Sequence, residues 1–316
     1  MNDQTISRPL PPTLQDRLRR DGPHRRFVMT AEIAPPVSFD GADLLRKAAG
    51  RNGLADAVNV TDGAGARAHM AALAAAKLVL DAGIEPVLQL TCRDKNRIAL
   101  QSELMGAAAL GIKNLLILTG DDPKAGDQPE TKPVFDVDSR TLIETARRLR
   151  DEGTLPTGRK VEGKAAFFIG AADMPIDPPA GWQPTALLAK IKAGAQFAQT
   201  QFCMDAGIVR RYVSVLEAAG VTKQLSLLIG VNPLRSAKSA AWMKSHLFGT
   251  IIADAYIARL EKSAEPAREG INICVELIEE LSTIPGVAGV HIMAPGNDAA
   301  IPEVIAQVRT RVQTKA

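Results

Sequence analysis

A lone carboxylate ends a mostly apolar, β-prone run near the start of the chain. Glu32 follows Phe27–Ala31, and Pro35 and Pro36 stop the run shortly afterwards. A carboxyl group in this position is either a solvated residue before a turn or a partly desolvated acid placed for proton transfer. The position by itself does not separate the two readings, so the residues that close the later strands decide between them.

Carboxylates and amides close nearly every later apolar run, whereas lysine and histidine are almost absent there. In chain order the residues are Thr61 and Asp62; Gln89, Thr91 and Asp94; Gly120, Asp121 and Asp122; Asp173; Gln199 and Gln201; Asn232; and the segment 291–297. This set suits hydrogen bonds to a neutral heterocycle with several N–H groups, together with one or two proton transfers. It does not suit the binding of a polyphosphate by charge alone.

The segment Leu116–Pro123 carries a more specific signal. A buried strand ends at Gly120, where the missing side chain lets a ligand approach the backbone, and Asp121 then presents a carboxylate. The polar connection behind it is long for a βα loop and typical of a lid or a cofactor wall. Asp121 is too far from the next helix to cap it, and Asp138 is the expected N-cap there.

The stretch Gly63–Ala68 matches the GxGxxA dinucleotide fingerprint in form. It follows a strand and leads into a helix, as a pyrophosphate site requires. However, another strand already precedes it, and the nearest acidic candidate for a ribose, Asp94, lies beyond the next strand. We therefore expect a glycine-rich βα loop and not a Rossmann site.

Polar residues inside the later strands need a separate interpretation. Gln199 and Gln201 alternate on one predicted strand, so both side chains should face the same side. Because a buried amide needs polar partners, we expect Gln201, nearer the strand's end, to bind a ligand and Gln199 to be mainly structural. His291, Cys92 and Cys203 lie within strands and are expected to be core residues.

Composition limits the class of protein. Of 316 residues, 46% are hydrophobic, 23% charged and 4% aromatic, and 38 basic against 35 acidic residues give a net charge of +3. The arginine cluster in residues 17–26 lacks the interleaved aromatics of a nucleic-acid site. The 3 cysteines and 4 histidines show no spacing for a disulfide framework or a metal site. Without an apolar stretch of ~18 residues or an apolar signal core, we expect a cytoplasmic protein with no membrane contact.

Short strand-like runs and longer amphipathic runs alternate after residue 26. The expected strands are Phe27–Ile33, Ala57–Asp62, Pro86–Arg93, Asn114–Gly120, Ala165–Asp173, Phe197–Met204, Gln224–Val231 and Gly289–Ala294. The expected helices are Ala42–Ala49, Arg67–Ala82, Asn96–Leu110, Ser139–Glu152, Pro184–Ala193, Ala206–Ala219, Ala237–Leu247, Asp254–Lys262, Glu265–Leu281 and Ile301–Val312. The pattern predicts an α/β protein with a single (β/α)8 TIM barrel over residues 27–316 and extra helices before the last strand. Residues 1–26 should form an N-terminal arm or a short leading helix, and a doubly wound sheet is the competing fold.

Several of these motifs, in this order and spacing, resemble the methylenetetrahydrofolate reductases, flavin-dependent (β/α)8 enzymes of one-carbon metabolism. The similarity covers about residues 27 to 310. The matching segments are Glu32–Pro36, Val58–Ala64, Leu90–Cys92, Thr119–Asp121, Ala193–Ala195 and Thr200–Phe202.

The resemblance implies a mechanism. NADH or NADPH would reduce bound FAD, and methylenetetrahydrofolate would then replace the nicotinamide in a ping-pong cycle. Glu32 would protonate N10 of the folate and open its ring to a 5-iminium cation, which takes hydride from the reduced flavin to give 5-methyltetrahydrofolate. Asp121 would hold the pterin and stabilise the cation. Gln201 would orient the pterin, and Gln199 is a further candidate for substrate binding.

The resemblance places the flavin at the ends of the middle strands. Its candidate ligands are Thr61, Asp62, Ala64, Gln89, Thr119, Gly120, Asp121, Asp173, Met174 and Lys190. Gln89 stands where well-known bacterial members have a histidine, Thr119 replaces an arginine and Met174 a tyrosine. Two flavin-phosphate contacts map to Ala186 and Ala189, which leaves Lys190 alone. We therefore expect a weakly bound flavin, an altered pose or another electron donor.

Two other functions stay open. One is a methyltransferase-type pterin-binding barrel that presents methyltetrahydrofolate to a corrinoid partner. The other is a flavin-deficient subunit that binds a reductase partner. The sequence does not distinguish NADH from NADPH, tetrahydrofolate from a related pterin, the direction of the reaction, or a monomer from a homo-oligomer.

Overall fold

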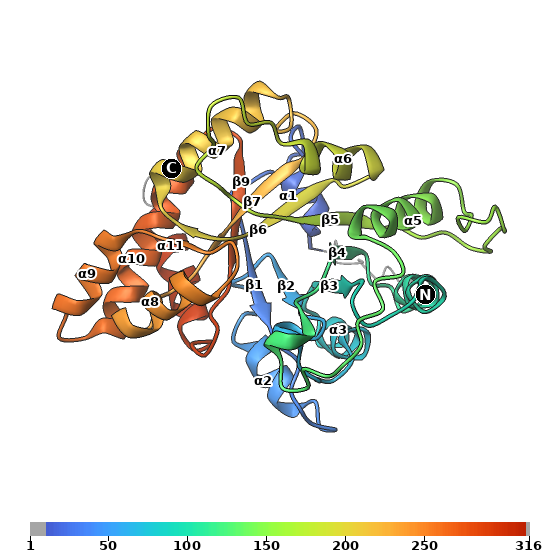
Figure 1. The fold of residues 1–316 in the computed structure, drawn as a ribbon, viewed down its shortest axis with the longest axis horizontal. Coiled ribbons are helices and arrows are strands. Elements are labelled where there is room, and N and C mark those ends of the chain that lie inside the picture. Colours follow the sequence, from blue (N-terminus) through green and yellow to red (C-terminus); the bar gives the residue numbers. More distant parts are fainter. Residues whose placement is uncertain (1–10, 314–316) are drawn as a thin grey trace, which may run out of the picture.

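The computed structural model, which describes residues 11–313, contains a closed barrel of eight parallel strands (Figure 1). They are β1 (Val28–Ile33), β2 (Ala57–Val60), β3 (Pro86–Thr91), β4 (Asn114–Leu118), β5 (Phe168–Asp173), β6 (Phe197–Met204), β7 (Ser226–Val231) and β9 (Val287–Ile292). Strands β1 to β7 are neighbours in order, and β9 pairs with both β7 and β1 and so closes the ring. This confirms the predicted barrel and excludes the doubly wound sheet, which has open edges.

Helices surround the barrel (Figure 1). They are α1 (Leu14–Leu18), α2 (Ala42–Ala49), α3 (Ala72–Asp81), α4 (Arg97–Ala109), α5 (Ser139–Asp151), α6 (Thr185–Ala193), α7 (Ala206–Ala218), α8 (Ala237–His246), α9 (Asp254–Lys262), α10 (Pro266–Leu281) and α11 (Ala300–Gln313), with short 3-10 turns η1 (Ala64–Ala66) and η2 (Pro123–Ala125). Helices α8, α9 and α10 all precede the last barrel strand, as predicted. The two-residue strand β8 (Ile251–Ile252) pairs with the end of β6 and was not expected from the sequence.

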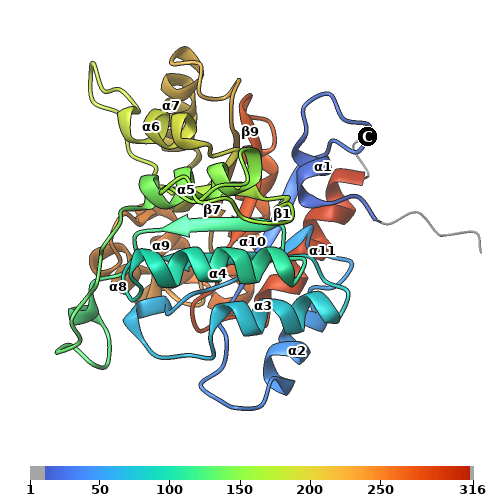
Figure 2. The ribbon, with the colours of Figure 1, turned by 90° about the vertical axis from the view of Figure 1, so that its right-hand side faces the viewer.

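Helix α1 closes the amino-terminal end of the barrel. Leu14 and Leu18 are buried in one cluster with residues near the starts of the strands, which are Val28, Ala57, Val87, Leu116, Phe168, Phe197 and Leu228. Figure 2 shows α1 at the end of the barrel opposite to the strand arrowheads. The described part of the predicted arm, from residue 11 onward, is therefore docked on the barrel, and residues 1–10 lie outside the described residues.

Polar contacts fix α1 in this position. Thr13 and Asp16 form a capping box at its first turn. The backbone N–H of Leu14 donates to both carboxyl oxygens of Glu85 at 2.9 Å, and Arg17 donates to the carbonyl of Asp56 at 2.9 Å. The bonds to Glu85 satisfy an N–H group that a short helix cannot pair internally, and the bond from Arg17 ties α1 to the residue before β2.

The helix expected from Arg67 begins five residues later, at Ala72. The reason lies in the glycine-rich loop before it. Gly63 and Gly65 have left-handed φ values of +60° and +64°, which favour glycine, and the N–H of Met70 donates to the carbonyl of Pro36 at 2.9 Å. The chain therefore crosses to the neighbouring loop before it enters α3. The glycines therefore do not lead directly into α3, as the glycines of a Rossmann site lead into their helix.

Candidate active site

Glu32 lies at the carboxyl end of β1 with its side chain inside the barrel. Its neighbours Ala31 and Ile33 belong to the core between strands and helices, so alternation along the strand turns Glu32 inward. Its side chain is 25% exposed. The carboxyl group is thus partly removed from solvent and still within reach of a ligand at the mouth of the barrel.

Two nitrogen atoms approach the same oxygen of Glu32. The Nε2 atom of Gln89, on β3, lies 3.5 Å from Oε2, and the Nε2 atom of His291, on β9, lies 3.7 Å from it. Within the described part of the chain, nothing makes a hydrogen bond to Oε1. The protein therefore contacts one carboxyl oxygen and leaves the other for a ligand.

A buried polar layer lies beneath Glu32. Gln199 and Asn59 exchange amide hydrogen bonds of 2.6 and 3.1 Å, and Nε2 of Gln199 also donates to Oγ1 of Thr30 at 2.9 Å. Oγ1 of Thr30 lies 3.0 Å from Nδ1 of His291, its neighbour in the β1–β9 register. All four residues are at most 2% exposed, so their polar groups depend on one another.

The two glutamines of β6 have different environments. Gln199 donates both amide hydrogens inside the polar layer, which matches the structural role expected from the sequence. Gln201 is half-buried, accepts from the N–H of Phe202 at 3.0 Å and donates to the carbonyl of Phe248 at 3.3 Å. The register of β6 against β7 shifts between Gln199 and Phe202, so strict alternation does not hold between the two glutamines.

Asp121 lies on the exposed loop after β4 and is tied to the glycine-rich loop. Its Oδ2 atom accepts from the N–H of Gly65 at 2.9 Å, and its carbonyl accepts from the buried side chain of Arg93 at 3.4 Å. Gly120 has a φ of +101°, and a Cβ there would lie 2.8 Å from Cβ of Arg93, so glycine is required. None of the described residues bonds to its Oδ1 atom, which is therefore open to a ligand.

Several residues predicted to bind a flavin have protein partners. Asp62 accepts from the N–H and hydroxyl of Thr91 at 3.0 and 3.1 Å and pairs with Lys95 at 3.0 Å. Lys190 donates to the carbonyl of Ala172 at 2.6 Å. These contacts join neighbouring strands and helices, and they use the charged groups that a cofactor would need.

Asp173 and Met174, at the end of β5, are engaged in the same way. Asp173 accepts from the hydroxyl of Tyr212 on α7, and burial raises the pKa of the carboxyl group although that bond opposes the shift. Burial also raises the pKa of the Tyr212 hydroxyl. Met174 packs against Gly249, where a side chain would collide with the methionine sulfur. Both side chains are therefore packed into the barrel wall.

Thr61 differs from these residues. Its Oγ1 atom is buried and has no hydrogen-bond partner among the described residues. A buried hydroxyl without a partner costs free energy, which a ligand at the end of β2 would recover by bonding to it. Of the other candidates, Ala64 is half-buried in η1 and Thr119 is exposed after β4.

The sequence reasoning missed Thr30 and Asn59 and treated His291 only as a core residue. His291 is buried, as expected, but one ring nitrogen faces Glu32. A usable signal was present in two strands. Thr30 precedes Glu32, and Asn59 precedes Thr61, by two residues in otherwise apolar runs, which puts each polar pair on the inward face.

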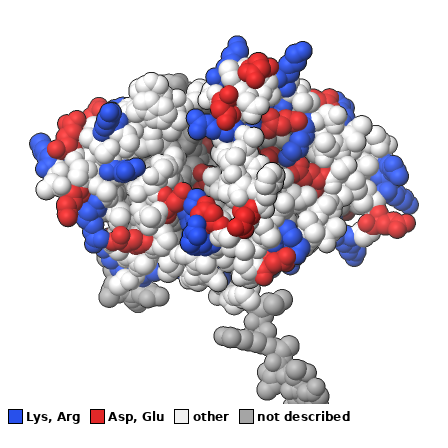
Figure 3. All heavy atoms as spheres, turned by 90° about the horizontal axis from the view of Figure 1, so that it is seen from below, with Lys and Arg blue, Asp and Glu red and all other residues white. Residues whose placement is uncertain are grey.

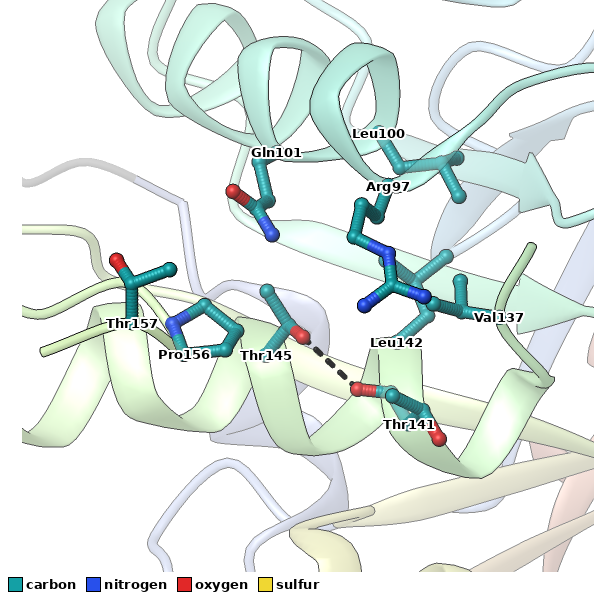
Figure 4. A pocket seen from close by; sticks show the side chains of 9 residues that line it. All are labelled: Arg97, Leu100, Gln101, Val137, Thr141, Leu142, Thr145, Pro156 and Thr157. Atoms are coloured by element: carbon teal, nitrogen blue, oxygen red, sulfur yellow. Dashed lines mark hydrogen bonds between the residues drawn. The ribbon is translucent and has the colours of Figure 1, made fainter.

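A separate hollow of about 240 Å³ lies outside the barrel, between α4 and α5. Figure 4 shows Arg97 and Gln101 of α4 facing Thr141 and Thr145 of α5. Arg97 is already paired with Asp136 at 2.8 Å. This hollow belongs to the helical layer and shares no residue with the barrel mouth.

Other classes of site receive no support from the described residues. Among them no group of three or more His, Cys, Asp and Glu side chains is arranged to hold a metal ion, and none of their helices is long and apolar enough to cross a membrane. On the face in Figure 3, acidic and basic side chains are interspersed. That face therefore offers no surface of one sign for a polyanion.

A family model and two related proteins that match this chain carry the same description. A family model described as methylenetetrahydrofolate reductase matches residues 15–309. A probable methylenetetrahydrofolate reductase (NADPH) of Caenorhabditis elegans is 23% identical over 239 residues, which are 73% of this chain and 33% of that protein. Methylenetetrahydrofolate reductase 1 of Schizosaccharomyces pombe is 23% identical over 313 residues, 92% of this chain and 47% of that protein. The chain thus spans between a third and a half of these relatives.

Two solved structures share the fold. An uncharacterized protein from Clostridium thermocellum that binds two copies of 5-methyl-5,6,7,8-tetrahydrofolic acid superposes with a TM-score of 0.61 at 12% identity, covering 89% of this chain and 94% of that one. The EDTA monooxygenase of Chelativorans sp. BNC1 superposes with a TM-score of 0.55 at 12% identity, covering 92% and 94%. At this identity the likeness concerns the barrel alone.

Proposed function

The chain belongs to the methylenetetrahydrofolate reductase family, and from this premise we propose that it reduces 5,10-methylenetetrahydrofolate to 5-methyltetrahydrofolate with electrons from NADH or NADPH. The observation that carries the proposal is the placement of Glu32. Its carboxyl group, 25% exposed, stands inside the barrel mouth, and none of the described residues bonds to its Oε1 atom, as a general acid for a ring nitrogen requires.

The residues at the mouth divide the chemistry between them. Glu32 donates a proton to N10, the bond between N10 and the bridging carbon breaks, and a 5-iminium cation forms. The carboxylate of Asp121 stabilises this cation, and Gln201 orients the pterin through its amide. The iminium carbon then takes a hydride that originates in the reduced nucleotide, which gives the methyl group.

The residues present do not fit a tightly held flavin dinucleotide. Lys190 is the only cation in the predicted flavin set, and its amine donates to a backbone carbonyl. Asp62 and Asp173 hold Lys95 and Tyr212. The hydroxyl of Thr61, buried and without a hydrogen-bond partner among the described residues, is a polar group of the kind that a flavin ring would use. We therefore propose weak flavin binding, and no step above depends on it.

A solved structure with a similar fold supports the choice of folate as the ligand. The Clostridium thermocellum barrel binds 5-methyltetrahydrofolate, the product of the proposed reaction, so this architecture is able to hold it. Because several residues predicted to bind the flavin are bonded to other protein groups, a second candidate function is a flavin-deficient subunit that works with a reductase partner. A methyltransferase-type barrel is disfavoured because it has no use for an acid on the first strand.

The deciding experiment is an anaerobic assay of the purified chain with NADH or NADPH, with and without methylenetetrahydrofolate and with increasing FAD. We expect folate-dependent oxidation of the nucleotide and formation of 5-methyltetrahydrofolate, detected by mass spectrometry. Absorbance of the purified protein and an FAD titration report the flavin. No product under any of these conditions would reject the reductase function and favour the partner-subunit candidate.

A further inference from the structure

Glu32 meets the protein through a single oxygen. Both neighbouring nitrogen atoms, from Gln89 at 3.5 Å and His291 at 3.7 Å, approach Oε2. Gln89 carries hydrogens on that nitrogen in every state. A histidine nitrogen is a donor in one tautomer and an acceptor in the other, so the role of His291 depends on which of its nitrogens holds the proton.

The hydroxyl of Thr30 determines the tautomer. Its oxygen already accepts a hydrogen from Gln199 at 2.9 Å, so its own hydrogen must point to another acceptor. The carbonyl of Val290 lies at 3.4 Å and Nδ1 of His291 at 3.0 Å. The shorter contact makes Nδ1 the acceptor, and a neutral ring then carries its hydrogen on Nε2, toward Glu32.

We propose that His291 is a positioning residue for Glu32: its Nε2–H tautomer, fixed by Thr30 and Gln199, holds Oε2 of the acid so that Oε1 faces the folate. This role rests on the proposed function of Glu32 as the proton donor. Nothing in the sequence distinguishes His291 from a histidine that only fills the core, and the network beneath it makes the difference.

The contacts of His291 and Gln89 with Glu32 matter most when Glu32 gives up its proton. The bond between Oε1 and hydrogen breaks, a bond between N10 and hydrogen forms, and a negative charge stays on Glu32. The N–H groups of His291 and Gln89 then face a carboxylate, to which they bond more strongly than to a neutral acid. Contacts of 3.5 and 3.7 Å in the free protein are expected to shorten as this charge develops.

The tautomer is tested without any assay of activity. In protein labelled with ¹⁵N-histidine, long-range ¹H–¹⁵N spectra separate the protonated from the bare ring nitrogen, and His291→Gln assigns the signal among the four histidines. We expect a neutral Nε2–H ring at neutral pH. Thr30→Val should mix the two tautomers, whereas Thr30→Ser should keep the first. A neutral Nδ1–H ring or an imidazolium in the unaltered protein would overturn the proposal.

Kinetics test the positioning role with a matched pair. A glutamine amide reaches the place of the Nε2 atom, whereas an asparagine amide reaches only that of Nδ1. We expect His291→Asn to lower kcat by about 10- to 100-fold, as loss of a hydrogen bond to a charged group does, with KM for the folate unchanged. His291→Gln should recover most of kcat, and His24→Gln, at an exposed histidine, should match the unaltered protein.

The two proposals fail in different ways. If the unaltered chain reduces no folate but shows the Nε2–H ring, the function is wrong and the network stands. If the unaltered chain is active and His291→Asn is equally active, or if His291→Gln and His291→Asn are equally impaired, the positioning role is wrong while the function stands. Thermal unfolding of each variant separates a kinetic effect from a loss of fold.

Discussion

Gln89 on β3 and Glu32 on β1 lie 3.5 Å apart although β2 separates their strands. Such an approach is possible only across the inside of the barrel, where side chains of alternate strands meet. His291 reaches the same carboxyl group from β9, on the other side of β1. Three strands therefore define the surroundings of one acid, and its position is fixed by the sheet and not by a loop.

Replacement of this acid should remove the chemical step and little else. Glu32→Gln keeps the shape and hydrogen bonding of the side chain but cannot protonate N10, so kcat for folate reduction should fall by about 10²- to 10⁴-fold. Binding of the folate, followed by titration, should change much less. Glu261→Gln, at an exposed glutamate, serves as the control. Unchanged turnover in Glu32→Gln would show that another group supplies the proton.

Removal of the unpartnered hydroxyl of Thr61 should stabilise the fold and weaken ligand binding. Thr61→Val removes a buried polar atom without a partner, so the free energy of unfolding should rise by about 1 kcal/mol. The same change should weaken binding of the ligand that uses the hydroxyl, measured as a higher Kd for the folate or for FAD. Thr61→Ser keeps the hydroxyl and should keep binding. A less stable Thr61→Val protein would mean that the hydroxyl has a partner in the fold.

The strands could be predicted because each is a short apolar run between turn residues, a purely local signal. The first turn of α3 could not, since it depends on two left-handed glycines and on a contact between Met70 and Pro36 in another loop. Strand β8 consists of Ile251 and Ile252 alone, and two residues carry no periodicity. Local patterns thus give the elements, and contacts distant in sequence set where they begin.

The site shows the same division. Glu32 and Asp121 could be predicted because each is a carboxylate at the end of an apolar run and beside turn residues, which is a local signal. The partner of Asp173 is Tyr212, on a helix that follows the next strand, and no spacing in the sequence announces that pair. The tautomer of His291 depends on Thr30, 261 positions away along the chain. Which polar groups are free for a ligand is a property of the assembled barrel.

Helix α1 should contribute to the stability of the whole barrel. Leu14 is fully buried, so Leu14→Ala should lower the free energy of unfolding by roughly 2–5 kcal/mol, as large-to-small core changes do. Arg20→Ala, on the exposed side of the same segment, should change it by less than about 0.5 kcal/mol. Urea titration at constant pH measures both. Equal stability of the two variants would show that the helix is not part of the cooperative unit.

The buried carboxyl group of Asp173 should make stability depend on pH. Burial raises its pKa in the folded protein, whereas the unfolded value is about 3.9. Between these two values the folded state binds more protons, so stability is highest below the unfolded pKa and falls as pH rises through the folded one. Asp173→Asn cannot titrate and still accepts from Tyr212. Its stability relative to the unaltered protein should therefore increase from pH 4 to pH 8 in urea unfolding.

Asp177 provides a control of opposite sign for this prediction. Its exposed carboxylate is bonded to Arg211, which lowers its pKa. It stabilises the folded state above the unfolded pKa and loses that effect as pH falls through the folded one. Asp177→Asn should therefore lose stability relative to the unaltered protein as pH rises, by an amount that added salt reduces. If both variants shifted in the same direction with pH, burial would not be the dominant influence on Asp173.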